Sequence, residues 1–256
     1  MVNKKMNRIF VSRDKIISDS DSVRIDNNNI ILLSSDIYSI EYVGINEINL
    51  CIKIDNFSDV VLFESSFLDD INVNNKYVIN GGKLRVNKFY NNNSVVEKID
   101  IDLYSNGEID YRFSNICKNK ESYEININHN GVGTISNINN KSIAMDGSNL
   151  DFVINSIVKK EYEKSVLNQN TRIVTFGLCD TKISPNMFID CDDIEARHGS
   201  IIGTFKDDVV FYLMCRGISY NDAIKLLIKG YLFSNIDNSN DMLREKIINV
   251  IDMYWR

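Results

Sequence analysis

The sequence predicts a mainly β fold that ends in α-helices. Short β-branched segments that alternate at period two or run apolar fill roughly the first two hundred residues, and asparagine, aspartate, serine or glycine separates them. Beyond residue 206 the apolar spacing changes to that of amphipathic helices. The 256 residues are 44% hydrophobic, which is enough for a continuous core. Many short strands joined by tight turns are compatible with a sandwich, a barrel or a solenoid.

The first 125 residues are interpreted as β scaffold. Their segments of strand character are 30–32, 48–54, 59–65 and 98–105. No fixed-length repeat is visible, which disfavours a hexapeptide-type β-helix. The NGGK stretch at 80–83 is interpreted as a turn, because its spacing to lysine does not fit a phosphate loop. Abundant asparagine fits turns that need the left-handed backbone region, and AT-rich codon usage would produce the same excess.

From residue 123 to 202 the strands become more regular. The segments of strand character are YEINI, GTISNI, KSIAM, NLDFVINSIV, TRIVTFG, NMFIDC and IEARHG. They lack hairpin signals, which favours parallel coils, in which strands stack about 4.8 Å apart and residues one coil apart become neighbours. SVLNQNTR at 165–172 and CDTKISP at 179–185 are interpreted as corners.

The remaining residues are expected to be helical. Asp207 or Asp208 can cap a helix that runs through Cys215, and Gly217 ends it in the left-handed conformation. Ser219, followed three residues later by Asp222, resembles a capping box. Two further helices have the apolar stripes Ala223, Ile224, Leu227, Ile228 and Tyr231, and Leu243, Ile247, Val250, Ile251 and Tyr254. Such helices either cover an open edge of the β body or form a docking surface.

Composition narrows the partners and the compartment. A net charge of −6 disfavours a nucleic-acid partner, which requires a basic face. The longest apolar run is 209–215, far short of the roughly 20 residues that cross a bilayer, so no membrane is expected. No apolar signal segment follows the first methionine, and five irregularly spaced cysteines argue against a disulfide framework. A cytoplasmic protein is expected.

A family pattern covers residues 192–233. It consists of DDIEARHGSIIG, then DDVVFYLMCRGIS, then AIKLLIKGYLF. Three features follow one another in fixed order. The first is an acidic pair before His-Gly, and the second is an acidic patch before a phenylalanine–tyrosine–leucine segment and Arg-Gly-Ile. The third is a helix that ends in glycine and an aromatic residue. This order resembles the core signature of the SufB/SufD family of iron–sulfur cluster assembly proteins. A weaker likeness extends upstream to about residue 123.

The resemblance implies an architecture and partners. The fold would be a right-handed parallel β-helix over residues 1–205, followed by a helical segment at 206–256. Two subunits would associate through their β-helix ends, as a homodimer or with a second SufB/SufD-like chain. The C-terminal helices would dock a SufC-like ABC ATPase, which fits the absence of a phosphate loop here. The chain resembles a compact form that lacks the N-terminal helical domain of longer members.

The resemblance also singles out site residues. His198 aligns with the histidine of the His-Gly pair in SufD-like members, and Gly199 follows it where SufB-like members have glutamate. Cys179 falls where SufB-like members have a Cys-Gly. Asn170 stands near the position of another SufB-type cysteine and cannot serve as a thiolate.

Several residues have both a ligand interpretation and a structural one. His198, Cys179 and Cys191 have the thiolate and imidazole groups that iron and transient iron–sulfur clusters need, although burial is the favoured explanation for Cys191. Exposed strand surface is favoured over oxygen ligands for Asp190, Asp192, Asp193 and Glu195. His129 is interpreted as a turn residue. Core positions are expected for the other three cysteines, Cys51, Cys117 and Cys215.

Possible ATPase contacts on the helices are Arg216, Lys225, Leu227, Tyr231 and Phe233, with a pairing to an acidic group favoured for Arg216. The main hypothesis is a non-enzymatic scaffold for cluster assembly that works with the ATPase. The alternative is an interaction subunit that recruits the ATPase without holding a cluster. A β-helix enzyme acting on polysaccharide or acyl groups is weakly supported, since no hexapeptide repeat or distinctive carboxylate cluster is present.

Overall fold

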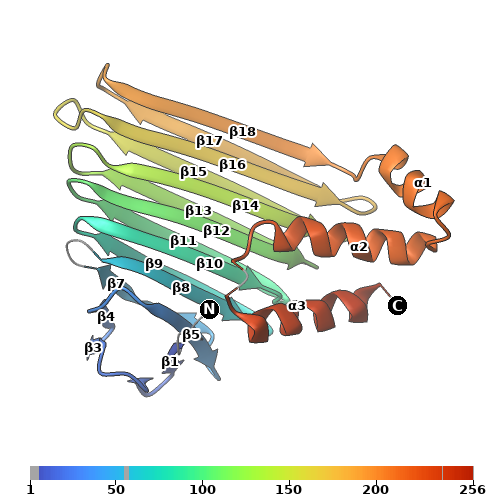
Figure 1. Cartoon of the computed structure of the whole chain (residues 1–256), viewed down its shortest axis with the longest axis horizontal. Coiled ribbons are helices and arrows are strands. Elements are labelled where there is room, and N and C mark those ends of the chain that lie inside the picture. Colours follow the sequence, from blue (N-terminus) through green and yellow to red (C-terminus); the bar gives the residue numbers. More distant parts are fainter. Residues whose placement is uncertain (1–5, 55–57, 238, 256) are drawn as a thin grey trace.

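The computed structural model describes residues 6–54, 58–237 and 239–255. They form a parallel β-solenoid followed by three helices (Figure 1). The strands are β1 (Asn7–Ser12), β2 (Ile16–Ser18), β3 (Val23–Asp26), β4 (Asn29–Leu32), β5 (Ile37–Val43), β6 (Glu47–Ile48), β7 (Cys51–Ile54), β8 (Asp59–Ser66), β9 (Asp70–Ile79), β10 (Gly82–Tyr90), β11 (Ser94–Leu103), β12 (Gly107–Cys117), β13 (Lys120–His129), β14 (Ile135–Ala144), β15 (Asn149–Val158), β16 (Ser165–Thr175), β17 (Asp180–Ile189) and β18 (Ile194–Gly203). The helices are α1 (Asp207–Cys215), α2 (Tyr220–Phe233) and α3 (Asp241–Tyr254).

Two sheets face each other across the core. The helix-side sheet has the order β18-β16-β14-β12-β10-β8-β5-β1-β2, and the free sheet has the order β17-β15-β13-β11-β9-β7-β4-β3. Neighbouring strands are parallel except for the antiparallel pairs β1–β2 and β3–β4, which lie at the N-terminal end. A mainly β parallel solenoid with C-terminal helices is therefore confirmed, and the sandwich and the barrel are excluded.

Coil length varies along the solenoid. Asp59, Lys83, Glu108, Ile135, Val166 and Glu195 are successive register partners, so the steps between them are 24, 25, 27, 31 and 29 residues. Turns of different length produce these differences while the strands stay in register. This variation explains why the sequence shows no fixed repeat.

The turns depend on asparagine and glycine. Asn27 and Asn106 adopt left-handed conformations with φ of 51° and 59°. The NGGK stretch makes the predicted turn, which leads from β9 into the start of β10, with Gly81 and Gly82 at φ of 74° and 80°. A Cβ at Gly131 would lie 2.2 Å from the backbone nitrogen of Ser105, so the turn after β13 tolerates only glycine there.

Asparagine also stacks within the strands. On the outer face of the free sheet, Asn126 donates to Asp100, Asn155 donates to Asn126, and Asn186 donates to Asn155, at 2.9, 2.8 and 2.9 Å. Each of these bonds joins equivalent positions of adjacent parallel strands. Part of the asparagine excess therefore has a structural use beyond turns.

The second and third helices cover the outer face of the helix-side sheet (Figure 1). Ile228 and Ile247 are fully buried there against a cluster that includes Phe89 and Ile143. Burying one such side chain contributes roughly 1.5–3 kcal/mol. The Ser219 hydroxyl accepts from the Asp222 amide at the start of α2, and Asn240 caps α3 in the same way through the Leu243 amide. The first helix lies beyond the end of β18.

Four details differ from the sequence predictions. Residues 165–172 and 179–185 are strand and not corners, because Gln169 and Thr171 occupy inward positions that a hydrophobic pattern misses. The two short strands expected within 133–145 are one strand, β14, since Asn140 points inward and donates to Thr171. Lys206, and not an aspartate, is the N-cap of α1. Cys215 is exposed and not in the core.

Candidate functional site

The last coil of the solenoid is open to solvent. In β15, alternate residues are buried, whereas every residue of β17 and β18 is half-buried or exposed. These two strands end their sheets, so no described strand pairs with their outer edges. The opposite end is closed by the hairpins β1–β2 and β3–β4. The open end therefore presents unpaired backbone groups and inward-facing side chains that elsewhere form the core.

His198 is exposed at the middle of this open end. Its register partner on β16 is Gln169, which is buried with 3% exposure. Register partners in parallel strands point to the same face, so the His198 side chain projects from the inward face of the last coil. Asn170 and Gly199 form the next register pair, and the Asn170 side chain projects from the outer face. His198 and the SufB-type position at Asn170 thus lie on opposite faces of the sheet.

Cys179 lies in the turn before β17. Its thiol is half-buried and lies 3.2 Å from the Met145 carbonyl oxygen and 3.3 Å from that of Phe176. The thiol packs against the interior of the solenoid. In this position it is a half-buried, hydrogen-bonded residue at the start of β17, whereas His198 lies on β18, the edge strand of the other sheet.

Cys191 lies at the other end of β17, in the turn that leads to β18. The ten residues of β17 separate it from Cys179 by about 33 Å. Burial first, and then the negative charges of Glu163 and the neighbouring aspartates, raise the pKa of the Cys191 thiol. Asp190, Asp192, Asp193 and Glu195 around it are exposed. A thiol in an acidic turn forms its thiolate less readily, which disfavours soft-metal binding.

The three predicted ligands are not assembled within one chain. Among the described residues, no group of three or more His, Cys, Asp or Glu side chains is placed to hold a metal ion. Only His198 combines exposure with a central place at the open end. Any cluster at this end therefore requires ligands from outside the chain.

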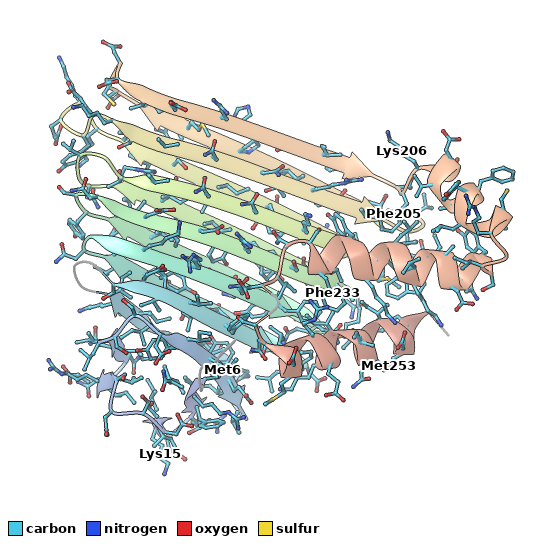
Figure 2. The ribbon with its side chains drawn as sticks, viewed as in Figure 1. Met6, Lys15, Phe205, Lys206, Phe233 and Met253 are labelled. Carbon is cyan, nitrogen blue, oxygen red and sulfur yellow. The ribbon has the colours of Figure 1, made fainter. Side chains whose placement is uncertain are left out.

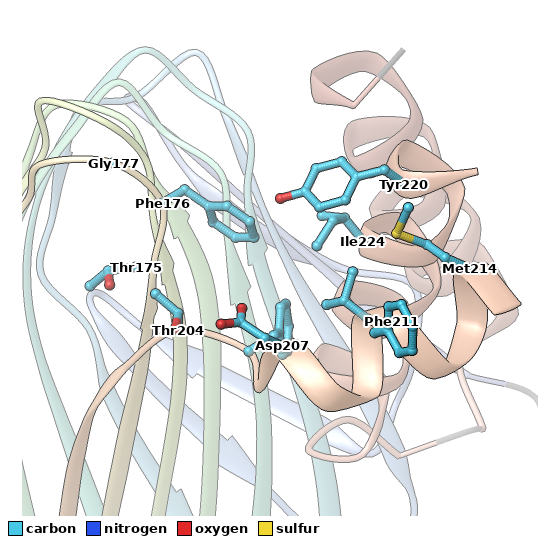
Figure 3. Close-up of a pocket in the computed structure, with 11 residues that line it drawn as sticks. Thr175, Phe176, Gly177, Thr204, Asp207, Phe211, Met214, Tyr220 and Ile224 are labelled. Atoms are coloured by element: carbon cyan, nitrogen blue, oxygen red, sulfur yellow. The ribbon is translucent and has the colours of Figure 1, made fainter. Parts of the chain in front are cut away.

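A cavity of about 370 Å³ separates the last coil from the helices (Figure 3). Phe176, Met214 and Ile224 are part of its wall, and the Asp207 carboxylate and the Tyr220 hydroxyl are directed toward the solenoid (Figure 3). Phe205 and Lys206 connect β18 to α1 beside it (Figure 2).

The first helix is unusually exposed. Val210 is its only buried residue, whereas Phe211 is 68% exposed. Other large apolar side chains of this region are also exposed, namely Leu178, Val209, Tyr212, Met214 and Tyr220. An apolar surface beside a cavity is typical of an interaction site.

The predicted docking residues of the helices are mostly packed. Tyr231 is buried and donates to the Arg172 carbonyl oxygen at 2.6 Å, so its predicted surface position is corrected. Leu227 and Phe233 are half-buried against the sheet, and Lys225 lies 3.7 Å from Asp222. Arg216 is exposed, but it stacks on Tyr212 with 4.9 Å to the ring centroid and not on an acidic group.

The sequence interpretation missed a buried ionic cluster inside the solenoid. Lys88 is fully buried and bonds Glu97, with Glu64 3.4 Å away. The hydroxyls of Tyr42 and Tyr77 donate to Glu64. Acidic residues that interrupt apolar runs, such as Glu64 in VVLFES and Glu97 in VVEKID, are the sequence signal for such a cluster. His129 is also buried and is not a turn residue, since its ring nitrogens lie 2.7 Å from Thr134 Oγ1 and 3.0 Å from Ser136 Oγ.

None of the helices in the described part of the chain is both long enough and apolar enough to span a bilayer.

Comparisons with known proteins connect the fold to a family. A family model described as the SufBD core domain of SUF system FeS cluster assembly matches residues 80–231.

Curated relatives agree with this match. A SufBD family protein of Archaeoglobus fulgidus is 33% identical over 80 residues, which are 31% of this chain and 21% of the relative. SufD of Escherichia coli is 31% identical over 62 residues, 24% of this chain and 15% of the relative. SufD of Bacillus subtilis is 26% identical over 136 residues, 52% of this chain and 31% of the relative. The matches thus span less than a third of each of these relatives. Since the family model covers more than half of the chain, the protein belongs to the SufBD core-domain family of the SUF iron–sulfur cluster assembly system.

Proposed function

We propose that this chain is a scaffold subunit of iron–sulfur cluster assembly that holds a cluster transiently, as cargo, at the open end of its solenoid. The observation that carries the proposal is the exposed last coil, with the His198 imidazole at the centre of its inward face. Imidazole is a ligand that iron accepts in clusters. Family membership supports the same role. No catalytic step is assigned to the chain.

The remaining ligands would come from a second subunit. A single chain offers one exposed imidazole at this end and no group of three ligands in its described part. The free edges of β17 and β18 suit pairing with another solenoid end, either of a second copy or of a related SufB/SufD-like chain. Two joined ends would bring two inward faces together around the cargo.

A SufC-like ATPase is the proposed partner of the helical end. The sequence contains no phosphate loop, so nucleotide chemistry would belong to the partner. The exposed apolar face of α1 and the adjacent cavity are better suited to docking than the packed residues of α2. ATP-driven movement of the partner would strain the paired solenoids and expose the ligands. The proposed compartment is the cytoplasm, where the free thiols stay reduced.

Anaerobic reconstitution with ferrous iron and sulfide tests the site. We expect the full-length protein, together with its ATPase, to acquire iron, acid-labile sulfide and visible cluster absorbance. His198→Ala should lose most of this absorbance, whereas Arg197→Ala, which changes an exposed neighbour on the outer face, should retain it. Equal cluster content in the His198→Ala variant would refute the assignment.

A second candidate function is an interaction subunit that recruits the ATPase without binding a cluster. The separation of Cys179 from Cys191 and the asparagine at position 170 favour it. It predicts a stable complex with the ATPase that contains no iron or sulfide under the same conditions. Metal analysis of the complex therefore distinguishes the two functions.

A further inference from the structure

Gln169 has an unused hydrogen-bond acceptor beside His198. Its side-chain nitrogen donates to Ser156 Oγ at 2.8 Å and to the Asn186 carbonyl oxygen at 3.1 Å, which fixes the amide across the interior. Its oxygen Oε1 is buried and has no hydrogen-bond partner among the described residues. An unpaired buried acceptor costs about 1–3 kcal/mol, so a partner in the working protein is expected.

The register limits which neighbour can supply that partner. On β14 the residue paired with Gln169 is Ile138, whose side chain has no donor. On β18 the paired residue is His198, whose ring carries an N–H. Adjacent parallel strands lie about 4.8 Å apart, a distance that a glutamine and a histidine projecting from the same face can bridge.

We propose that Gln169 is a positioning residue for His198. Rotation of the exposed His198 ring would bring one ring nitrogen to Oε1, which would then accept a hydrogen bond from it and leave the lone pair of the other nitrogen directed to the open end. A histidine ligand needs one deprotonated nitrogen, and a carbonyl acceptor on the opposite nitrogen sets its tautomer and orientation. The functional use of this hydrogen bond rests on the proposed role of His198 as a cluster ligand. The existence of the hydrogen bond does not depend on that role.

The ring nitrogens of His198 test the proposal directly. The chain contains only two histidines, so long-range ¹H–¹⁵N correlations of the full-length, cluster-free protein assign both rings. We expect His198 to show one tautomer in the wild type. In Gln169→Leu the two ring nitrogens should shift toward averaged values, and Gln169→Glu, which restores an acceptor, should restore the single tautomer. His129, held by Thr134 and Ser136, reports whether each variant is folded.

A tautomer mixture in the wild type, or identical His198 shifts in wild type and Gln169→Leu, would overturn the proposal. The wild-type spectrum decides this even if Gln169→Leu fails to fold. In reconstituted samples, Gln169→Leu should weaken iron retention against a chelator about tenfold or more. If the wild type binds no cluster, the proposed function fails, while the spectra still decide the role of Gln169.

Discussion

Two buried ionisable residues make opposite contributions to the pH dependence of stability. Burial raises the pKa of Glu121 to about 7, although Tyr123 and Asn115 donate hydrogen bonds to it. Burial lowers the pKa of His129 to about 4. The folded protein therefore keeps a proton on Glu121 that the unfolded chain releases, and lacks a proton on His129 that the unfolded chain takes up. Their effects oppose each other between about pH 4.5 and 6.5.

Single substitutions at Glu121 and His129 separate the two opposite contributions to the pH dependence of stability. The Glu121 contribution is complete below its unfolded pKa and is lost as the pH rises through 7, so the stability of wild type relative to Glu121→Gln should fall by about 2–3 kcal/mol from pH 5 to 7.5. The His129 contribution is lost as the pH falls from 6.5 toward 4. Relative to His129→Gln, wild type should therefore lose about 2 kcal/mol from pH 6.5 to 5. Urea unfolding followed by circular dichroism measures both differences, and parallel pH profiles of the three proteins would contradict them.

At the scale of single elements, α1 has fewer buried residues than the other two helices of the described chain. Its exposed apolar residues contribute little to stability in the isolated chain, because only Val210 is buried. Phe211→Asp should thus change the free energy of unfolding by no more than about 0.5 kcal/mol. If α1 docks the ATPase, the same substitution should weaken binding of a purified cognate SufC-type ATPase at least about tenfold in calorimetry.

Leu226 provides a matched control on α2. It is 51% exposed and does not line the cavity, so Leu226→Asp should leave ATPase binding unchanged. Equal loss of affinity in both variants would extend the docking surface to α2, and no loss in either would exclude these helix faces.

The helices were largely predictable from sequence, and the strands less so. Ser219 and Gly217 mark helix boundaries through local chemistry that needs no tertiary information. The sequence predicts a corner at residues 165–172 and not a strand, because the buried positions of β16 include Gln169 and Thr171, whose partners come from other coils. A buried polar side chain whose hydrogen-bond partner lies in another coil cannot be recognised as buried from the hydrophobic pattern of its own strand.

At the scale of the whole molecule, the family resemblance indicates one place in the fold, whereas ligand chemistry does not. The motif around His198 lies at the open end of the solenoid. Ligand chemistry instead predicts a common site for Cys179 and Cys191, which lie at opposite ends of β17. Sequence spacing within a solenoid does not tell which sheet or which end a residue occupies. Those positions follow from turn lengths that vary from coil to coil.

The contrast between the two solenoid ends predicts a dimer through the last coil. One end is capped by hairpins, and the other exposes β17 and β18 with Phe188 and Ile202 at 56% and 46% exposure. Long edge strands are otherwise prone to uncontrolled pairing, so a specific partner is expected to cover them. In light scattering after gel filtration, we expect the full-length protein at micromolar concentration to have twice the chain mass of 29.4 kDa.

Ile202→Lys tests whether the open end forms that dimer. A lysine on the inward face of the last coil would be buried without a partner in the joined ends, so the variant should have the mass of a single chain. Val96→Lys changes an equally apolar, 60% exposed residue of β11 on the free sheet, away from the open end, and should remain dimeric. Because Ile202 is nearly half exposed in the single chain, the substitution should leave the fold intact by circular dichroism. A dimer that persists in Ile202→Lys, or a wild type that is monomeric, would rule out self-association through this end and leave a related SufB/SufD-like chain as the partner for the cluster site.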